Sequence, residues 1–395
     1  MLLAPQSSRA SEATSSDKHA CLAGFGSADG CVALVTGSSG FVGSRLVEML
    51  LGRGAKTVIA FDITQPDKSL RKRFERVQAK TGGNIIVLHG KDGDLTSDVA
   101  VDGAFHVKGL DKIDIVFHIG ALTGPFFPVK LYHEVNYEGT LRIIEGCIKH
   151  NVPKLVYSSS PSTRFTGSDI EGLREDEMQI PSSFIVPYAE TKAKGEMAVH
   201  KACNEDNGLL TISVAPHQVY GPYDSLFLPK ILETAGNDRL NIFGNGQNLI
   251  SICHVDNYCH GLLCGADALY KKSPALAKYY VVHDGKPVNI WKLLNHAIVA
   301  MGFTDLESKI HLPKWLLYAV AYICSFVSLL TGIKFKLNPF VVRMMTIHRY
   351  FSIENATRDL AYEPIIPTDA GWSLTIEWFK THWYPKWKRE GTSTL

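Results

Sequence analysis

Tyr188 and Lys192 are four positions apart at the end of the segment Pro187–Lys192. In an α-helix this spacing puts two side chains on one face, one turn apart. An ammonium group beside a phenol favours the phenolate and lowers the phenol's pKa from about 10. Such a phenol can take a proton from an alcohol or return one to a ketone. Because Tyr-x-x-x-Lys also occurs on ordinary surface helices, its meaning depends on the rest of the chain.

A glycine-rich segment follows the first predicted strand. Cys31–Thr36 is a short apolar and β-branched run that is typical of a buried parallel strand, and a helical pattern covers residues 44–51. Between them the spacing Gly-x-x-Gly-x-x-Gly brings backbone N–H groups and a helix N-terminus against a pyrophosphate. The residues that we expect at this group are Gly37, Gly40, Phe41, Val42 and Gly43.

Asp62 closes the second predicted strand, 57–61, and lies 19 residues after Gly43. A carboxylate at this position accepts hydrogen bonds from the adenosine ribose hydroxyl groups of a dinucleotide. It also repels a 2′-phosphate, so the sequence favours NAD over NADP as the cofactor. The basic cluster Arg71–Arg73 keeps NADP open, although such a cluster also suits a solvated helix face.

Strand and helix patterns alternate through the first half of the chain. Further strands are predicted at 84–89, 113–119, 154–158 and 210–215, with helices at 135–151 and 188–203. This alternation predicts an α/β fold of the Rossmann type, a doubly wound parallel sheet. Ligands of such sheets bind at the carboxyl ends of the strands. The further cofactor contacts expected there are Asp94 and Leu95 at the adenine, Ala121 and Pro216.

Taken together, these motifs resemble the extended short-chain dehydrogenase/reductases. The chain is most similar to their 3β-hydroxysteroid dehydrogenase family, and within it to the decarboxylating sterol-4α-carboxylate 3-dehydrogenases. The broader motifs are Thr36–Gly43, Asp62, Gly93–Leu95, Phe117-His118, Val135–Thr140, Ser158–Ser160, Tyr188-x-x-x-Lys192 and Pro216–Pro222. The narrower similarity rests on Gly244–Leu249, Ile290-Trp291, Leu312–Trp315 and His348–Ser352. The resemblance spans residues 31–380.

The resemblance implies a catalytic role for three side chains. Tyr188 is the expected acid/base, and Lys192 is expected to lower its pKa and to hold the nicotinamide ribose. Ser160 is expected to hydrogen-bond the reacting oxygen, with Ser159 as the alternative because the serines are adjacent. The implied reaction is the NAD-dependent oxidation of the 3β-hydroxyl of a 4α-carboxysterol to the 3-ketone, with loss of CO₂, in sterol biosynthesis.

Four further polar residues fall near the predicted site. His118 and Asn136 resemble family positions that we interpret as structural. His217, beside Pro216, could face a substrate, but a hydrogen-bonded loop histidine is the simpler interpretation. Arg164 is the candidate for binding the substrate carboxylate, which no motif identifies.

Three other functions stay open on the sequence alone. The nearest is a 3β-hydroxysteroid dehydrogenase/Δ5-isomerase that acts on non-carboxylated steroids. A nucleotide-sugar epimerase shares the nucleotide-binding motifs but has no use for the apolar run near the C-terminus. A non-catalytic NAD-binding protein would not need the complete Ser, Tyr and Lys set.

The apolar run Trp315–Thr331, within the stretch 313–333, has no charged residue. Its length is at the lower limit for a membrane-spanning helix, and a buried helix is the alternative. Residues 348–372 resemble the segment that completes the substrate domain, so the chain must return after this run. We therefore expect a monotopic or re-entrant anchor. With the family resemblance, this predicts a cytosol-facing location on the endoplasmic reticulum membrane.

Composition sets further bounds on the organisation and partners. A net charge of +2 among 395 residues gives no electrostatic case for nucleic acid binding, and the scattered cysteines lack metal-site spacing. The expected segments are a disordered tail (1–30, with a transit peptide as alternative), an NAD-binding domain (31–222), substrate-binding segments (223–385) and a C-terminal tail (386–395). The expected partners are a sterol and a membrane surface, with a homodimer and other sterol-demethylation enzymes left open.

Overall fold

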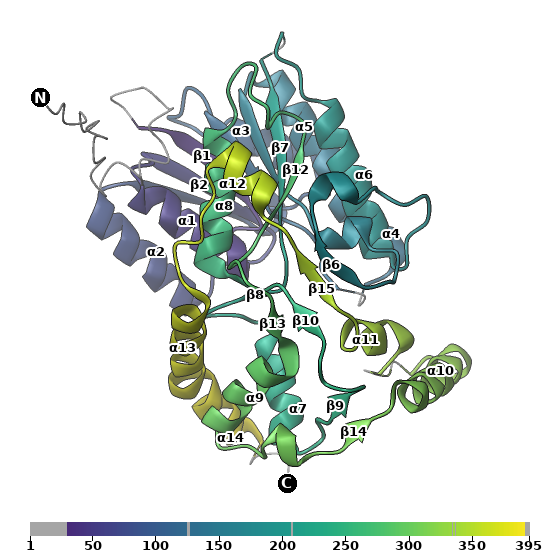
Figure 1. The fold of residues 1–395 in the computed structure, drawn as a ribbon. Helices are drawn as coiled ribbons and strands as arrows, with labels where there is room; N and C mark the ends of the chain where they lie inside the picture. Colours follow the sequence, from purple (N-terminus) through teal and green to yellow (C-terminus); the bar gives the residue numbers. More distant parts are fainter. Residues whose placement is uncertain (1–29, 125–126, 207, 334, 336, 392–395) are drawn as a thin grey trace, which may run out of the picture.

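Seven parallel strands form the central sheet of the computed structural model, which describes residues 30–124, 127–206, 208–333, 335 and 337–391 (Figure 1). The spatial order is β3-β2-β1-β4-β5-β7-β12, and each neighbouring pair is parallel. The strands are β1 Val32–Thr36, β2 Thr57–Asp62, β3 Asn84–His89, β4 Ile115–His118, β5 Lys154–Ser158, β7 Leu210–Pro216 and β12 Tyr279–Val282. The strand order turns back between β1 and β4, which defines the doubly wound topology. The predicted fold class is confirmed.

Helices cover both faces of this sheet. The side chains of β1 alternate between two separate cores, because successive residues of a strand point to opposite faces. One core includes α1 Phe41–Gly52, α2 Lys68–Thr81, α8 Val255–Asp267 and α12 Glu354–Leu360. The other includes α3 Asp98–Phe105, α5 Gly139–Lys149 and α6 Pro187–Lys201. Cys253, Cys259 and Cys264 are buried in the first core, as expected for small apolar side chains.

A smaller part of the fold lies beyond the carboxyl ends of the sheet (Figure 1). Its four-stranded sheet has the order β13-β10-β15-β6. Its strands are β6 Ile170–Leu173, β10 Leu249–Ile250, β13 Val288–Asn289 and β15 Arg349–Phe351. Its helices include α7 Leu228–Gly236, α9 Ile290–Ala300, α13 Thr368–Trp378 and α14 Tyr384–Gly391. A third core, with Trp291, Trp372 and Phe379, joins these helices.

The remaining described elements are short, except for one helix. They are α4 Val129–Tyr132, a π-helical turn His133–Glu138, the 3₁₀ turns Gly90–Asp92, Pro161–Arg164, Glu175–Glu177 and Leu306–Ser308, a second π-helical turn Phe379–Trp383, β8 Val219–Tyr220, β9 Ile242–Phe243, β11 Cys253–His254, β14 His311–Leu312 and α11 Pro339–Met344. The exception is α10, Lys314–Thr331, which is described below.

The chain passes between the two parts more often than the sequence predicted. Strand β12 pairs with β7 as the seventh strand of the central sheet, and α8 and α12 pack on its face. Residues 279–282, which were predicted to belong to the substrate-binding segments, thus lie in the central sheet. Within the predicted C-terminal tail 386–395, α14 reaches Gly391 and Trp387 contacts the Phe303 ring, and residues 392–395 lie outside the described residues. The predicted tail 1–30 lies, apart from Gly30, outside the described residues.

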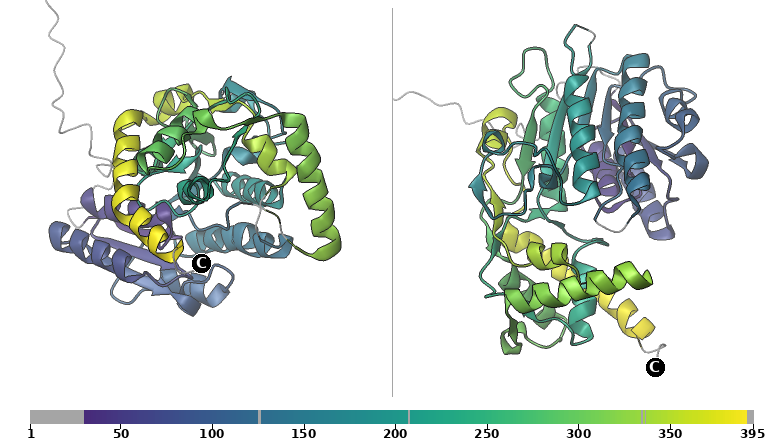
Figure 2. Two further views of the ribbon diagram at one scale, coloured as in Figure 1. Left: turned by 90° about the horizontal axis from the view of Figure 1, so that it is seen from below. Right: turned by 90° about the vertical axis from the view of Figure 1, so that its right-hand side faces the viewer.

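Helix α10 lies at an edge of the molecule, on the side opposite α13 (Figure 2). It has 18 residues with a mean hydropathy of 1.5, long and apolar enough to cross a membrane, and only 11% of it is buried. Leu317 and Ala321 pack against Val342 of α11 with Tyr318 partly buried beside them, whereas many of the other side chains are exposed. Trp315 is 72% exposed and Leu329 is 81% exposed. The alternative of a buried helix is therefore wrong.

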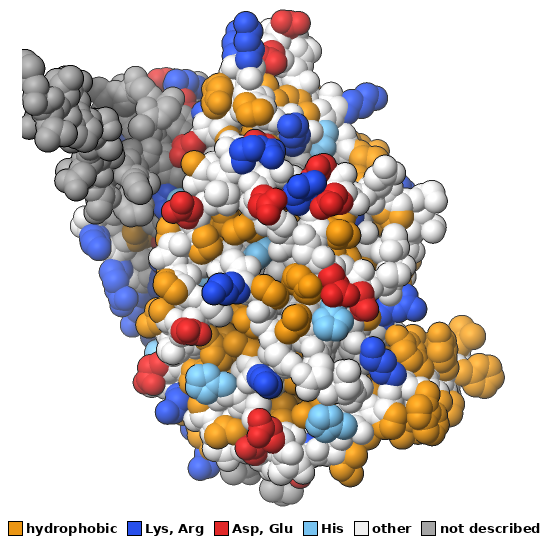
Figure 3. All heavy atoms as spheres, in the orientation of Figure 1, with side chains coloured by type: hydrophobic (Ala, Val, Ile, Leu, Met, Phe, Trp, Pro, Cys, Tyr) orange, Lys and Arg blue, Asp and Glu red, His pale blue; other side chains and the backbone are white. Residues whose placement is uncertain are grey.

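Apolar side chains gather at the position of α10 on the surface (Figure 3). After α10 the chain returns to the main body, since β15 pairs with β10 on one side and with β6 on the other. This return is the topology that the sequence predicted for residues 348–372.

Candidate active site

The turn from β1 to α1 is closed by backbone packing that only glycine permits. Gly37 has a φ of +71°, and a Cβ on it would lie 2.7 Å from the Cα of Gly120. A Cβ on Gly43 would lie 2.0 Å from the carbonyl oxygen of Gly37. Helix α1 begins at Phe41, and no side chain caps its N-terminus at Gly40. Its first N–H groups thus suit an anion such as a pyrophosphate.

Asp62 links the end of β2 to this glycine turn. Its carboxylate accepts hydrogen bonds from the backbone N–H groups of Ser39, at 2.9 Å, and Thr64, at 2.7 Å. A carboxylate has about four acceptor positions, so these two bonds orient it and leave capacity for ribose hydroxyls. No pattern in the sequence marks Ser39, whose amide reaches the Asp62 carboxylate only because the turn folds over the end of β2.

The other predicted cofactor residues also lie at the carboxyl edge of the sheet. Asp94 follows β3 and accepts hydrogen bonds from the amide and hydroxyl of Thr96, both at 2.8 Å. Leu95 is buried, and a Cβ on Gly120 would lie 2.9 Å from its side chain. Ala121 follows β4, and Pro216 ends β7. The parallel pairing thus brings together residues that are far apart in the sequence.

The three serines at the end of β5 have different partners. Ser158 Oγ lies 2.7 Å from the Tyr258 hydroxyl, and Ser159 Oγ donates to Glu196 at 2.5 Å. The Ser160 hydroxyl accepts the amide of Ser162 at 3.2 Å and lies close enough to the Tyr188 phenol to lower its pKa. Of the two serines left open by the sequence, Ser160 is thus the one beside Tyr188. Glu196 was not identified, although it follows Lys192 by one helical turn on the same face.

Tyr188 is the second residue of α6, which begins at Pro187, where a fixed proline φ suits the first turn. Burial raises the pKa of the Tyr188 phenol above its usual value, while the hydrogen bond from Ser160 and the charge of Arg349 lower it. In the structure the charge of Arg349 lowers this pKa. The effect of Lys192 on the phenol stays a prediction.

Lys192 is turned toward the end of β5 instead. Its ammonium donates to the carbonyl oxygen of Ser158 at 2.6 Å and lies 4.0 Å from the centre of the Tyr157 ring. Burial lowers the pKa of Lys192 to about 7, and the charge of Glu196 opposes this shift. Lys192 therefore ties α6 to the strand that carries the serines.

The side chains of Arg164 and His217 both contact other groups of the protein. Arg164 donates two hydrogen bonds to buried Glu196, at 2.9 and 2.5 Å, and its guanidinium lies 3.5 Å from the centre of the Tyr279 ring. Removing one partner of such a buried pair is strongly destabilising, so a ligand would have to compete with Glu196. This pairing argues against the expectation that Arg164 binds a substrate carboxylate. His217 Nδ1 lies 2.6 Å from the Ser251 carbonyl oxygen, in agreement with the simpler interpretation.

His118 and Asn136 have the contacts of structural residues. His118 lies between the hydroxyls of Thr36, at 2.7 Å, and Thr140, at 3.0 Å. Asn136 Oδ1 accepts the amide of Leu122 at 2.8 Å, and its Nδ2 donates to the Leu122 carbonyl at 3.0 Å. Both residues thus fix the backbone around the end of β4.

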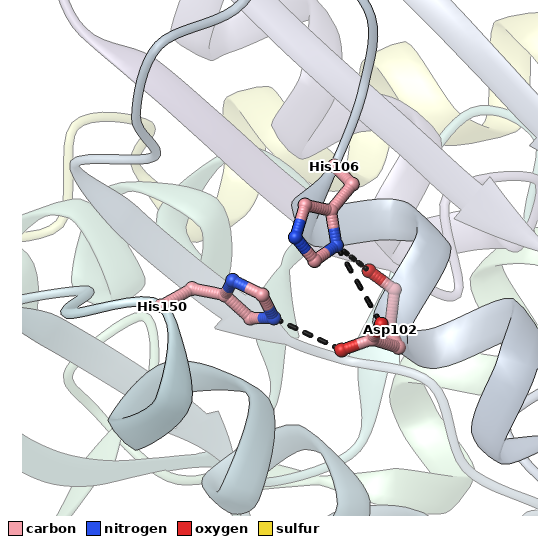
Figure 4. Close-up of side chains that lie close together, drawn as sticks. All are labelled: Asp102, His106 and His150. Atoms are coloured by element: carbon pink, nitrogen blue, oxygen red, sulfur yellow. Dashed lines mark hydrogen bonds and ion pairs between the residues drawn. The ribbon is translucent and has the colours of Figure 1, made fainter.

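A cluster of metal-ligand residue types lies at the opposite edge of the sheet, near the starts of β4 and β5. Asp102, His106 and His150 have ligand atoms within 4.8 Å of one another (Figure 4). However, the Asp102 carboxylate is bonded to the Lys149 ammonium at 2.6 Å and to His150 Nε2 at 3.0 Å. These bonds hold the pKa of Asp102 down to about 2. These residues form a partly exposed hydrogen-bonded cluster that is remote from the carboxyl ends of the strands.

The fold and the strand-end residues define a Rossmann-type NAD-binding protein. The same fold occurs in a solved dTDP-glucose 4,6-dehydratase from Streptomyces venezuelae with NAD bound, which has a TM-score of 0.66 and 19% sequence identity. That similarity covers 90% of this chain and 99% of the dehydratase.

Sequence comparison places the chain more narrowly. The profile of the 3-beta hydroxysteroid dehydrogenase/isomerase family matches residues 34–314. The chain is 30% identical to 2-alkyl-3-oxoalkanoate reductase of Stenotrophomonas maltophilia, over 86% of this chain and 96% of the reductase. It is also 30% identical to human sterol-4-alpha-carboxylate 3-dehydrogenase, decarboxylating, over 88% of this chain and 87% of the human enzyme. The protein belongs to the 3-beta hydroxysteroid dehydrogenase/isomerase family and is an NAD-dependent oxidoreductase.

Proposed function

We propose that this protein oxidises the 3β-hydroxyl of a 4α-carboxysterol to the 3-ketone with loss of CO₂. The observation that carries the proposal is the position of Ser160 beside Tyr188 at the sheet edge where the glycine turn and Asp62 also lie. The similarity to the human sterol-4-alpha-carboxylate 3-dehydrogenase supports the choice of alcohol.

The proposed mechanism assigns one task to each polar group. Ser160 and Tyr188 hydrogen-bond the substrate hydroxyl, and the Tyr188 phenolate takes its proton. Bound at this edge of the sheet, NAD⁺ would supply the acceptor for the hydride that leaves C3. Asp62 would hold the adenosine ribose and disfavour a 2′-phosphate, and the α1 N-terminus would hold the pyrophosphate. Lys192 fixes the distance between α6 and the serines and would bind the nicotinamide ribose.

Loss of CO₂ follows from the chemistry of the ketone. Once C3 is a ketone, the carboxylate is β to it, and the C4–carboxylate bond breaks with its electron pair moving to the ketone oxygen. CO₂ leaves, and the resulting enolate is protonated at C4. Hydrogen bonds from Ser160 and Tyr188 to the oxygen stabilise its developing negative charge.

A second candidate comes from the bacterial relative, the 2-alkyl-3-oxoalkanoate reductase. As its name states, that enzyme reduces an acid with a ketone on carbon 3, the same oxo-acid unit that the oxidation of a 4α-carboxysterol would generate. The same acid/base pair serves either direction, because the phenol returns the proton that the phenolate takes. Because α10 is apolar and exposed, it favours a substrate that is dissolved in a membrane, such as a sterol, over a soluble acid with a fatty acyl chain.

We further propose that α10 anchors the protein to a membrane without crossing it. The helix has one face packed on α11 and an outward apolar face, and the chain after it pairs with β6 and β10 on the main body. An interfacial helix keeps one such face in the acyl region of a bilayer. The family similarity suggests the cytosolic side of the endoplasmic reticulum; a homodimer and contacts with other sterol-demethylation enzymes stay predictions.

Turnover measurements test the proposal. The purified protein with NAD⁺ is offered a 4α-carboxysterol, a plain 3β-hydroxysteroid and a UDP-sugar, and with NADH a 2-alkyl-3-oxoalkanoate. Equal amounts of NADH and CO₂ from the first alcohol alone support it, whereas turnover restricted to another substrate supports the corresponding rival. Tyr188→Phe should lower the rate by about 10²–10⁴-fold while NADH still binds. A rate near that of the wild type would rule out the role of Tyr188.

A further inference from the structure

Arg349 is a partly buried cation with no acidic partner in the part of the chain that the structure describes. It is the first residue of β15, and its backbone is fixed between two strands: it pairs with Ile250 of β10 and Ile170 of β6. Its carbonyl oxygen accepts the amide of Ser251 at 3.1 Å. The side chain therefore extends from a rigid position in the four-stranded sheet.

The guanidinium group of Arg349 has weak partners for a charged donor. Nη2 donates to Ser162 Oγ at 3.3 Å, Nη1 lies 3.3 Å from Met344 Sδ, and the Phe165 ring centre lies 4.8 Å from Cζ. The buried Nε has no hydrogen-bond partner among the described residues. Burial lowers the pKa of Arg349 to about 10, so it stays charged near neutral pH. A buried N–H of a charged group without an acceptor is unfavourable, and for Nε this points to a ligand as the missing partner.

The guanidinium lies beside the pair that holds the reacting hydroxyl. Its charge lowers the pKa of the Tyr188 phenol, and its neighbour Ser162 donates its amide to Ser160 Oγ. In a 4α-carboxysterol the carboxylate is on C4, next to C3, which carries the hydroxyl. It would therefore lie one carbon further from Ser160 and Tyr188 than the hydroxyl does. Arg349 is thus near the place where such a carboxylate would lie when Ser160 and Tyr188 hold the hydroxyl.

The other buried cationic side chains of the site already have hydrogen-bond partners within the protein. Arg164 is bonded twice to Glu196, and Lys192 donates to the Ser158 carbonyl. We propose that Arg349 binds the carboxylate of a β-hydroxy or β-oxo acid substrate and so selects carboxylated over plain sterols. This inference rests on the proposed function. A guanidinium and a carboxylate form two parallel charge-assisted hydrogen bonds, which fix the direction of the anion as well as its position.

The contact with Arg349 would also make the protein bind its substrate more tightly than its product. The carboxysterol carries the anion that Arg349 binds, whereas the decarboxylated ketone has lost it. The product therefore binds without this ion pair and should compete poorly with the substrate. The 2-alkyl-3-oxoalkanoate of the bacterial relative has a carboxylate in the same relation to its oxygen, so the same residue suits that unit.

The test compares two alcohols that differ only in the 4α-carboxylate. Wild type, Arg349→Met and Arg349→Lys are assayed for kcat and KM on each, and the ratio of the two kcat/KM values is compared. Any effect of Arg349 on the pKa of Tyr188 is common to both alcohols and cancels in this ratio. Arg349→Met should lower the preference for the carboxysterol about 30-fold or more, mainly through KM, and Arg349→Lys should restore part of it.

Arg343→Met is the matched control, because it removes an arginine from the same segment, at α11. It should leave the ratio unchanged, and NADH binding and thermal unfolding should show that each variant is folded. A wild type without turnover of the carboxysterol would contradict the proposed function. A wild type that turns it over without preference, a ratio unchanged in Arg349→Met, or the same loss in Arg343→Met would each overturn the assignment of Arg349.

Discussion

Ser158, Ser159 and Ser160 are chemically identical, yet their hydroxyl groups have three different partners. This difference arises because a strand end leaves its last side chains pointing to different sides of the chain. The first contacts Tyr258 of α8, the second contacts Glu196 of α6, and the third lies beside the phenol of Tyr188.

Replacing each serine should therefore give a different defect. Ser160→Ala removes a hydrogen bond to the reacting oxygen and should lower kcat by about 10²-fold. Ser159→Ala removes one partner of buried Glu196 and should lower the free energy of unfolding by about 1–3 kcal/mol, with a smaller effect on kcat. Turnover assays and urea unfolding of both variants check this. The reverse pattern would identify Ser159 as the substrate-binding serine.

At the scale of elements, the turn between β1 and α1 depends on contact between backbones. A Cβ on Gly43 would lie 2.0 Å from the Gly37 carbonyl oxygen, and neither atom belongs to a flexible side chain. Gly43→Ala should therefore push α1 away from the turn, lower the free energy of unfolding by about 1–3 kcal/mol and weaken NADH binding.

Gly52→Ala supplies the control within the same helix. A Cβ there has no atom within 4 Å, so it should be neutral or stabilise by up to about 1 kcal/mol. Urea unfolding and NADH fluorescence titration measure both effects. If Gly43→Ala and Gly52→Ala had the same free energy of unfolding and the same NADH affinity, the turn would tolerate a displaced α1.

Helix α10 gives a second prediction at this scale. Ile323, Phe326 and Leu330 are each more than 60% exposed and lie on its outward face. Replacing all three by Ser should lower binding to phospholipid vesicles by at least about 100-fold, since each buried apolar side chain contributes about 1.5–3 kcal/mol. Sedimentation with vesicles measures the bound fraction.

The matched control removes exposed apolar side chains from other elements. Val99 of α3 and Leu374 of α13 are 83% and 56% exposed. Their replacement by Ser should leave vesicle binding unchanged. Binding that persists after the change in α10, or that is lost in the control, would exclude α10 as the anchor.

At the scale of the whole molecule, two buried histidines make stability depend on pH. Burial lowers the pKa of His118 to about 3 and that of His283 to about 4. His283 Nε2 lies 2.9 Å from the Phe351 carbonyl, and its Nδ1 accepts the Gly285 amide, so both ring nitrogens are used in the neutral form. Each histidine links a strand of the central sheet to another part of the fold.

The folded-state pKa values lie below the unfolded value of about 6.5, so protonation favours the unfolded chain. The stabilisation is complete above pH 6.5 and is lost as the pH falls toward 4, by about 3 kcal/mol for each histidine. Urea unfolding at several pH values should show this fall. His283→Gln should make the dependence weaker, and an unchanged dependence would show that other groups cause it.

The residues of the candidate site were easier to predict from the sequence than the later strand and helix that complete the fold. The glycine turn and Asp62 could be found because strand, turn and helix signals are local and lie close together in the sequence. Strand β12 was missed because Tyr279–Val282 is a short apolar run whose partner, β7, lies far back in the chain. Helix α14 was taken for a tail because its aromatic contacts, such as Trp387 with Phe303, are not visible in a local pattern.

The sequence by itself determined the family, the Rossmann-type sheet and the Tyr188 acid/base candidate, since each depends on spacing over a few residues. Only the tertiary structure distinguished the serines, paired Arg164 with Glu196, and turned Lys192 to the Ser158 carbonyl. It also brought Arg349 from a strand about 160 residues further along to the side of Tyr188. Charges act through space, and the distances between charged groups are set by how the chain folds.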